Sequence, residues 1–175
     1  MPNKSASFTI KANGILRILT SNVGIFVAST TKAIAVKAIW DTGATGSAIT
    51  KKISKSLGLI STGFADVNTA NGITRQNTYT IDIKLPNGVL IQGIIATEVD
   101  ALSGGCDALI GMDVITLGDF SITNHKGLTC MSFRVPSGHV IDYVKNPNYG
   151  ITPIKNIPAG KKGSNMSPKK KKRKK

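Results

Sequence analysis

Residues 38–44, Ala-Ile-Trp-Asp-Thr-Gly-Ala, give the strongest indication of how this chain of 175 residues folds and works. An apolar strand there runs directly into an acid, a hydroxyl and a glycine. A carboxylate at the end of such a strand is held rigidly and is partly desolvated, which suits an acid or base catalyst. The glycine allows a tight turn and the close approach of another chain. Asp41 is therefore the candidate catalytic residue, and Thr42, Gly43 and Ala44 form its loop.

A single carboxylate is not enough to activate a water and to protonate a leaving amine. Two carboxylates that share a proton are enough, because like charges about 3 Å apart do not both ionise readily. The chain contains one Asp-Thr-Gly triplet. Two triplets meet only if two chains meet across a two-fold axis. The motif therefore predicts a homodimer.

The sequence on both sides of the motif favours strands joined by tight turns. Asn-Gly between apolar runs is a strong hairpin signal, and Asn13-Gly14 predicts a hairpin within residues 6–19. Further hairpins are predicted at the following places: residues 23–40 around the Ser29–Lys32 turn, Asn71-Gly72, Pro86–Gly88, and Ile122 to Val135. Ala108–Ile110 is a candidate buried strand. The pattern favours a mainly β domain.

Two short helices interrupt the β pattern. Ile49, Ile53 and Leu57 recur every four residues, with Thr50 as the expected N-cap and Gly58 as the expected left-handed stop. A second, briefer helix is predicted around residues 114–117.

The sequence resembles the retroviral-type, or retropepsin-like, aspartic proteases of the cellular and bacterial kind. Asp41-Thr42-Gly43-Ala44 matches the active-site motif of that family. Residues 108–115, Ala-Leu-Ile-Gly-Met-Asp-Val-Ile, match its second signature, with Ile110, Gly111 and Asp113 in structural places. The hairpin with Asn71-Gly72 at its tip lies where the family has its flap. The resemblance covers roughly residues 20–135.

The resemblance implies a small closed β-barrel with one or two short helices, active as a homodimer. Asp41 of each subunit would hold a water that attacks an extended peptide, without a metal, a cofactor or a covalent intermediate. Thr42 would donate a hydrogen bond across the dyad, and the Gly43 carbonyl would meet the substrate. The flap near Asn71 and Gly72 would close over the peptide.

The chain departs from the family pattern at three positions. Thr45 and Met112 stand where many viral members have an Asp and an Arg that pair to support the dimer. Trp40 is bulkier than the small aliphatic residue usual before the catalytic Asp. Asp113 is expected to be an acid at a helix N-terminus, favoured by the helix dipole.

Two other functions remain open at this stage. The same fold could serve as a catalytically inactive peptide-binding or dimerisation module. The chain could instead bind nucleic acid or another polyanion through its basic tail, because ten Lys and Arg residues lie between Lys155 and Lys175. The first 154 residues hold 13 basic and nine acidic residues, so most of the net charge of +14 belongs to that tail.

Composition sets the expected organisation of the chain. We predict an N-terminal β-hairpin extension (1–20), a protease domain (21–135), an irregular extension (136–160) and a disordered polybasic tail (161–175). No run of 18 apolar residues predicts a membrane span. With Cys106 and Cys130 as its two cysteines and no secretory signal, the chain is expected in the cytoplasm, or in the nucleus of a eukaryotic host because of the tail.

Overall fold

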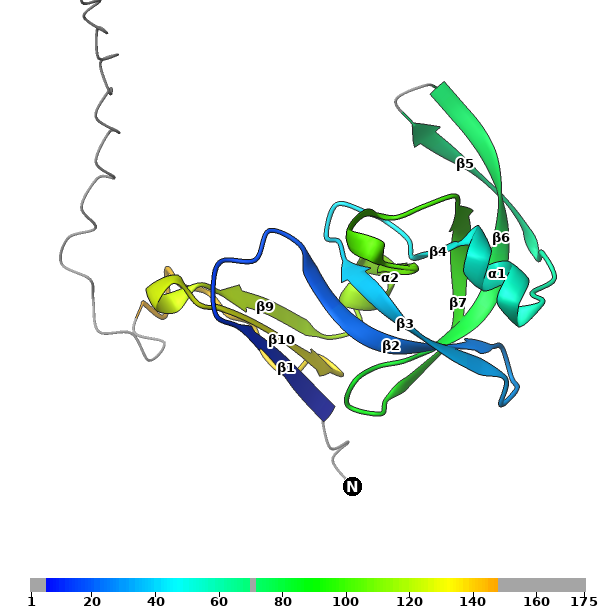
Figure 1. Cartoon of the computed structure of the whole chain (residues 1–175). Coiled ribbons are helices and arrows are strands. Elements are labelled where there is room, and N and C mark those ends of the chain that lie inside the picture. The colour runs from blue at the N-terminus through cyan, green and yellow to red at the C-terminus, as the bar shows by residue number, and fades with distance from the viewer. Residues whose placement is uncertain (1–5, 70–71, 148–175) are drawn as a thin grey trace, which may run out of the picture. The chain divides into compact units, whose positions relative to one another are not determined.

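The predicted strands and helices are present in the computed structural model, which describes residues 6–69 and 72–147 (Figure 1). The described strands are β1 (Ala6–Ala12), β2 (Leu19–Val27), β3 (Ala33–Trp40), β4 (Ala48–Thr50), β5 (Gly63–Thr69), β6 (Gly72–Lys84), β7 (Leu90–Val99), β8 (Ala108–Ile110), β9 (Asp119–Thr123) and β10 (Thr129–Val135). The described helices are α1 (Lys51–Leu57), α2 (Met112–Ile115) and the 3₁₀ turns η1 (Ser103–Gly105) and η2 (His125–Gly127). The mainly β fold class is confirmed.

The larger sheet has seven strands in the order β2-β3-β8-β4-β7-β6-β5. An additional antiparallel pairing of β2 with β6, with Ile25 opposite Ile83, closes the sheet on itself. Alternate side chains of these strands point inward, as the period of two along a strand requires. The most deeply buried interior side chains include Ile25, Ile49, Ile53, Ile81, Ile83, Ile110 and Val114. This apolar interior positions the motif at the end of β3.

Helix α1 has the predicted limits but a different N-terminal contact. Gly58 ends the helix with φ of 63°, and its N–H donates to Lys55 O at 3.0 Å. Thr50 occupies the N-cap position, yet its hydroxyl caps nothing and donates to Asp107 Oδ1 at 3.1 Å. The hydroxyl therefore ties the start of α1 to the loop before β8.

The smaller sheet corrects the prediction made for the N-terminus. Strand β1 pairs with β10, with Phe8 opposite Phe133, in a three-stranded sheet of order β1-β10-β9. The predicted hairpin at Asn13-Gly14 is therefore wrong, because β1 does not pair with the strand that follows it. Thr129 N–H donates to Gly14 O at 2.9 Å. The bend at Asn13-Gly14 is therefore bonded to the start of β10 and not closed into a hairpin. The contact distant in sequence outweighs the local preference.

An aromatic cluster joins the two sheets. Trp40, the last residue of β3, stacks on Phe120 of β9 with ring centroids 5.6 Å apart and an interplanar angle of 8°. Its ring also lies 5.1 Å from that of Phe133 and 5.7 Å from that of Phe8. Aromatic pairs at such separations add to the free energy gained by burial alone. The large Trp40 thus packs against the small sheet.

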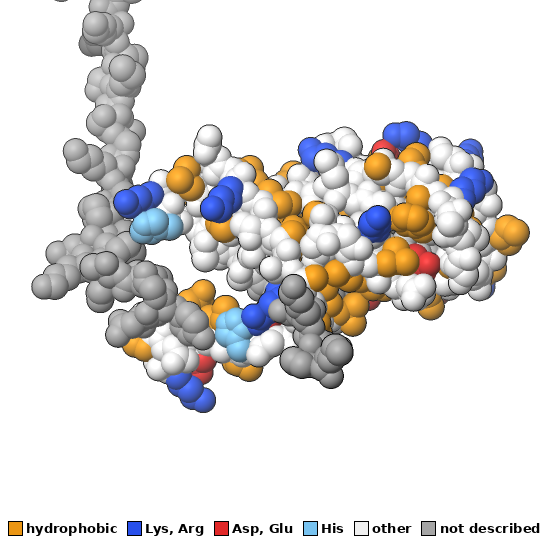
Figure 2. Space-filling model, turned by 90° about the horizontal axis from the view of Figure 1, so that it is seen from below, with side chains coloured by type: hydrophobic (Ala, Val, Ile, Leu, Met, Phe, Trp, Pro, Cys, Tyr) orange, Lys and Arg blue, Asp and Glu red, His pale blue; other side chains and the backbone are white. Residues whose placement is uncertain are grey.

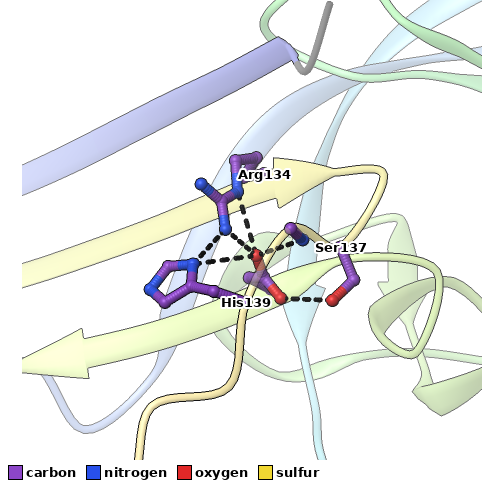
Figure 3. Close-up of polar contacts among 5 residues, drawn as sticks. Arg134, Ser137 and His139 are labelled. Atoms are coloured by element: carbon purple, nitrogen blue, oxygen red, sulfur yellow. Dashed lines mark hydrogen bonds and ion pairs between the residues drawn. The ribbon is translucent and has the colours of Figure 1, made fainter. Parts of the chain in front are cut away.

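A polar clamp holds the end of β10 to β9 (Figure 3). The carboxylate of Asp119 accepts hydrogen bonds from the Arg134 guanidinium, from Ser137 Oγ at 2.6 Å and from Gly138 N–H at 2.9 Å. Arg134 also contacts His139. The hydrogen bonds from Ser137, Gly138 and Arg134, in that order, hold the pKa of Asp119 well below its usual value. Residues 137–139 therefore continue the fold beyond β10.

The chain divides into two units, one ending at His139 and the other beginning at Val140. In the second unit, residues 140–147 are described, and they form a turn in which Asp142 Oδ1 accepts hydrogen bonds from the N–H groups of Val144 and Lys145. The domain limits proposed from the sequence stay predictions, and the tail of residues 161–175 lies outside the described residues. Among the described residues, the helices are all too short or too polar to span a membrane.

Candidate active site

Strand β8 lies between the two strands that flank the Asp41 loop. It pairs in parallel with β3, with Trp40 opposite Ile110, and antiparallel with β4, with Ala48 opposite Leu109. The loop from Asp41 to Ser47 therefore crosses the end of β8. Asp41 N–H donates to Ile110 O at 3.0 Å, which extends the β3–β8 ladder to the first residue of the loop. The two sequence signatures are thus brought together.

The loop holds the Asp41 carboxylate by its own backbone. Gly43 N–H donates to Asp41 Oδ1 at 2.8 Å, and Ala44 N–H donates to Asp41 O at 3.3 Å. A Cβ on Gly43 would lie 3.2 Å from Oδ1, so a larger residue there would crowd the carboxylate. Asp41 is half-buried, whereas Thr42 and Gly43 are exposed. The carboxylate is therefore oriented by the protein and accessible to a substrate.

Ser47 and Asp113 fix the far end of the loop to the second signature. Asp113 Oδ2 accepts from Ser47 N–H at 2.9 Å, and Oδ1 accepts from Ser47 Oγ at 2.8 Å. Ser47 Oγ in turn accepts from Gly111 N–H at 3.1 Å. Asp113 also accepts from Val114 N–H at 3.0 Å, so the expected place in the first turn of α2 is correct. Its contact with Ser47 was not predicted.

Backbone hydrogen bonds connect the Asp41 loop to the first residues of α2. Met112 N–H donates to Ala44 O at 2.8 Å, and Asp113 N–H donates to Thr45 O at 3.2 Å. These bonds connect the loop to α2 without any charged side chain at positions 45 and 112. The absence of the ion pair therefore does not leave the loop of the single chain unsupported.

Gly111 is required by the closeness of the two signatures. A Cβ at this position would lie 2.5 Å from both C and O of Gly46, a distance that real Cβ atoms do not reach. Any side chain at residue 111 would therefore push α2 away from the loop. The glycine of the second signature has a packing role in the support of Asp41.

Asp41 opens into a surface depression of about 330 Å³. The residues that line it are Arg17, Ile18, Leu19, Ile39, Trp40, Asp41 and Ser103. Arg17 and Ser103 were not found from the sequence, because they come from a connecting segment and from η1, far from the motif. Trp40 is itself 4% exposed, and its Nε1–H donates to Ser21 Oγ at 2.9 Å.

The predicted flap is a hairpin of β5 and β6. The pairing runs from Gly63 opposite Thr78 to Thr69 opposite Gly72. Gly72 begins β6 with φ of 109°, a conformation that favours glycine, whereas Asn71 lies outside the described residues. Arg75 lies over the exposed ring of Phe64, 4.6 Å from its centroid. The hairpin projects beyond the body of the sheet in Figure 1, but its closure over a substrate stays a prediction.

A buried carboxylate outside the Asp41 loop, that of Glu98, lies between α1, β6 and β7. Glu98 is 6% exposed and accepts from Ser54 Oγ at 2.5 Å and from the Tyr79 hydroxyl at 2.7 Å. Burial acts to raise the pKa of Glu98, but the hydrogen bonds from Ser54, Tyr79 and Asn77 lower it below its usual value. Burial, followed by the contact with Glu98, raises the pKa of Tyr79. This network anchors α1 to the sheet.

Three solved structures are similar to the chain at low sequence identity. A retropepsin-like aspartic protease from Rickettsia conorii is 20% identical, with 75% of this chain and 96% of that chain covered and a TM-score of 0.49. The EIAV protease, complexed with the inhibitor HBY-793, is 18% identical (57% and 86% covered; TM-score 0.45). The retroviral protease-like domain of Ddi1 from Leishmania major is 21% identical (57% and 78% covered; TM-score 0.37).

The curated proteins include no sequence that matches this chain. The sequence model of the family described as "gag-polyprotein putative aspartyl protease" matches residues 29–116, half of the chain. That range begins in the β2–β3 turn and ends after α2, so it contains the Asp41 loop, the flap hairpin and the second signature. The match in sequence and the crossing of β8 by the Asp41 loop agree that the chain belongs to the family of retropepsin-like aspartic proteases.

Proposed function

We propose that this protein is an aspartic endopeptidase that works as a homodimer, with one Asp41 contributed by each subunit. The observation that carries the proposal is the state of the Asp41 carboxylate. It is held by Gly43 N–H at 2.8 Å, it is half-buried, and it opens into a depression on the surface. Figure 2 shows Lys and Arg side chains spread over the face that it draws, with few acidic side chains among them. A general acid or base needs both this fixed orientation and this access.

The second subunit follows from the chemistry of the reaction. Water must lose a proton as it attacks the peptide carbonyl, and the carbonyl oxygen must receive one. Two carboxylates that share one proton perform both transfers, and they titrate as a pair. Since the chain has one Asp-Thr-Gly triplet, the second carboxylate comes from a second copy.

The dimer geometry follows from the same requirement. Two Asp41 side chains can share a proton only if each lies close to the two-fold axis. Thr42 and Gly43, the exposed residues that follow Asp41 in the loop, then lie in the interface between the two copies. This agrees with the inference from the resemblance that Thr42 contacts the other subunit. The hairpin of β5 and β6 would cover the extended substrate from the outside.

The proposal is tested by peptide cleavage in the wild type beside the Asp41→Asn variant. Asn keeps the size of the side chain but removes the base, so we expect cleavage of a mixed peptide library between pH 4 and 7.5 by the wild type alone. Mass spectrometry identifies the cut bonds, and sedimentation of the same samples gives the oligomeric state. A dimeric wild type that cuts no peptide would refute the proposal and would favour a peptide-binding module.

A mixed-dimer experiment tests the contribution of one Asp41 per subunit. Wild-type subunits are mixed with an excess of Asp41→Asn subunits, so that most wild-type chains are in mixed dimers. We expect activity per wild-type chain to fall toward zero as the variant increases. Activity that stays proportional to the amount of wild-type chain would show that each subunit works alone.

A further inference from the structure

We propose that Arg17 forms a carboxylate-binding subsite next to Asp41, and that the protein cleaves peptides with an acidic side chain close to the scissile bond. This inference rests on the proposed peptidase function, because it names the substrate class of the same site. Arg17 and Asp41 line one depression of about 330 Å³. The rest of its lining is apolar or uncharged: Ile18, Leu19, Ile39, Trp40 and Ser103.

The segment that carries Arg17 is held on both sides. Before it, Leu16 N–H donates to Thr129 Oγ1 at 2.8 Å, which ties the segment to β10. After it, Leu19 begins β2 and is paired with Trp40, the residue that precedes the catalytic candidate. The backbone on either side of Arg17 is therefore fixed relative to Asp41, and the guanidinium has a limited range of positions around the depression.

Arg17 is exposed and has no acidic partner among the residues that the structure describes. The four ion pairs found there join Lys52 to Asp107, Arg134 and His139 to Asp119, and Lys145 to Asp142. None of these pairs joins Arg17 to Asp41. The loop residues that follow Asp41, positions 42–46, carry no charge. The guanidinium is thus available to a ligand that enters the depression.

A guanidinium matches a carboxylate better than any other side chain does, because its planar N–H groups can donate two parallel hydrogen bonds. The apolar walls of the depression strengthen such a pair relative to one in open water. A carboxylate could come from an Asp or Glu side chain of the substrate or from the free C-terminus of a peptide. An endopeptidase acts within chains, so the inference commits to the side chain.

Matched peptides test the inference directly. A peptide cut by the wild type is made in C-terminally amidated versions with Glu or Gln at each position that flanks the cut, and kcat/KM is measured for every pair. We expect at least one Glu version to be cut about tenfold better than its Gln partner. Arg17→Gln should bring that ratio close to one, and Arg17→Lys should retain part of it. Arg17→Glu should instead favour a Lys-containing peptide.

Two controls separate the subsite from a general effect of charge and from recognition of a free C-terminus. Lys37→Gln makes the same change of charge at an exposed residue outside the depression, and it should leave the Glu/Gln ratio intact. A Gln peptide with a free C-terminus should be cut no better than its amidated version. Equal cleavage of all matched pairs by the wild type, a preference that survives Arg17→Gln, or a preference only for the free C-terminus would overturn the inference.

Binding distinguishes failure of this inference from failure of the proposed function. Fluorescence anisotropy of labelled Glu and Gln peptides is measured with Asp41→Asn alone and with Asp41→Asn combined with Arg17→Gln. Arg17-dependent preference for the Glu peptide without any cleavage by the wild type would support the subsite and refute the peptidase. If Arg17→Gln changed the monomer–dimer equilibrium but not the peptide ratio, Arg17 would serve the second copy and the inference would be wrong.

Discussion

Asp41 is supported from two sides by contacts of different chemistry. On the loop side, hydrogen bonds between the buried Ser47 and Asp113 hold the far end of the Asp41 loop to α2. On the strand side, Trp40 packs in an aromatic cluster with the small sheet. Polar contacts are directional and leave costly unpaired groups when one partner is removed. Apolar contacts depend on volume and shape, so they tolerate conservative exchange.

Removal of the Trp40 side chain should have the largest effect on stability. Trp40→Ala empties the space between Phe120 and Phe133, and we expect it to lower the free energy of unfolding by about 3–5 kcal/mol. Trp40→Phe retains a ring but loses the hydrogen bond to Ser21, so it should cost about 1–2 kcal/mol. Urea denaturation of the two variants and the wild type measures the difference. Equal losses would show that packing is not the main contribution of Trp40.

Removal of the Asp113 carboxylate should cause the second largest loss in the free energy of unfolding. It should also lower peptidase activity more than Trp40→Phe does. Asp113→Ala leaves Ser47 N–H and Oγ without their acceptor in a place where Ser47 is 1% exposed. We expect a loss of about 2–4 kcal/mol in the free energy of unfolding. Since the loop then loses its tie to α2, kcat/KM for peptide cleavage should fall as well.

Asp113→Asn is the matched control for that change. Asn keeps the size of the side chain and one acceptor oxygen, but its amide NH₂ faces a hydrogen-bond donor of Ser47. We therefore expect a loss in the free energy of unfolding between those of the wild type and Asp113→Ala. If Asp113→Ala proved as stable as the wild type, the contact between Ser47 and Asp113 would not support the loop. The backbone hydrogen bonds that Ala44 O and Thr45 O accept would then be sufficient.

The two sides of Asp41 also differ in how well the sequence predicts them. The sequence indicates two parts of the site because each needs a specific residue type. The motif at Asp41-Thr42-Gly43 needs a carboxylate followed by a turn. Gly111 must lack a Cβ, which would lie 2.5 Å from Gly46. Ser47 escaped detection because a single serine before an apolar run has many ordinary uses. Its burial against Asp113 arises only when β4 and α2 meet.

In the small sheet the hairpin of β9 and β10 was predicted correctly, but the partner of β1 was not, because the pairing of β1 is distant in sequence. The chain does bend at Asn13-Gly14, but β1 pairs with β10, more than 100 residues later in the sequence. Local turn signals cannot indicate which of several strands with similar patterns will pair. Arg17 was overlooked for the same reason, since its nearness to Asp41 depends on the Thr129 contact that ties residues 14–16 to β10.

The buried Glu98 network offers a polar contact away from Asp41, where the effect should be smaller and dependent on pH. Its hydrogen-bond donors Ser54 and Tyr79 favour the ionised carboxylate and lower its pKa in the folded state. The stabilisation is therefore present above the ordinary Glu pKa of about 4.3 and is lost as the pH falls below it, through the folded pKa. We expect Glu98→Gln to cost about 1–2 kcal/mol at pH 6 and less at pH 3.

Tyr79→Phe, which removes one hydrogen-bond donor and keeps the ring, is the control for Glu98→Gln. It should lose less stability at pH 6 than Glu98→Gln does. Unfolding measured at both pH values gives the comparison. A difference between wild type and Glu98→Gln that grew toward low pH would contradict the lowered pKa of Glu98.

The smallest effect is expected at the end of the small sheet, where two truncations separate polar from apolar support. Ending the chain after His139 keeps Ser137 and Gly138 on Asp119 and removes only the second unit, so the unfolding temperature should stay close to that of the full chain. Ending it after Val135 keeps all of β10 but leaves Asp119 with Arg134 alone, and the unfolding temperature should fall by a few degrees. Asp119→Asn in the longer of the two truncated proteins should reproduce part of that fall. If both truncations unfolded at the same temperature, β1, β9 and β10 would be held by their aromatic contacts and strand pairing, and the clamp would contribute nothing to the support of Trp40.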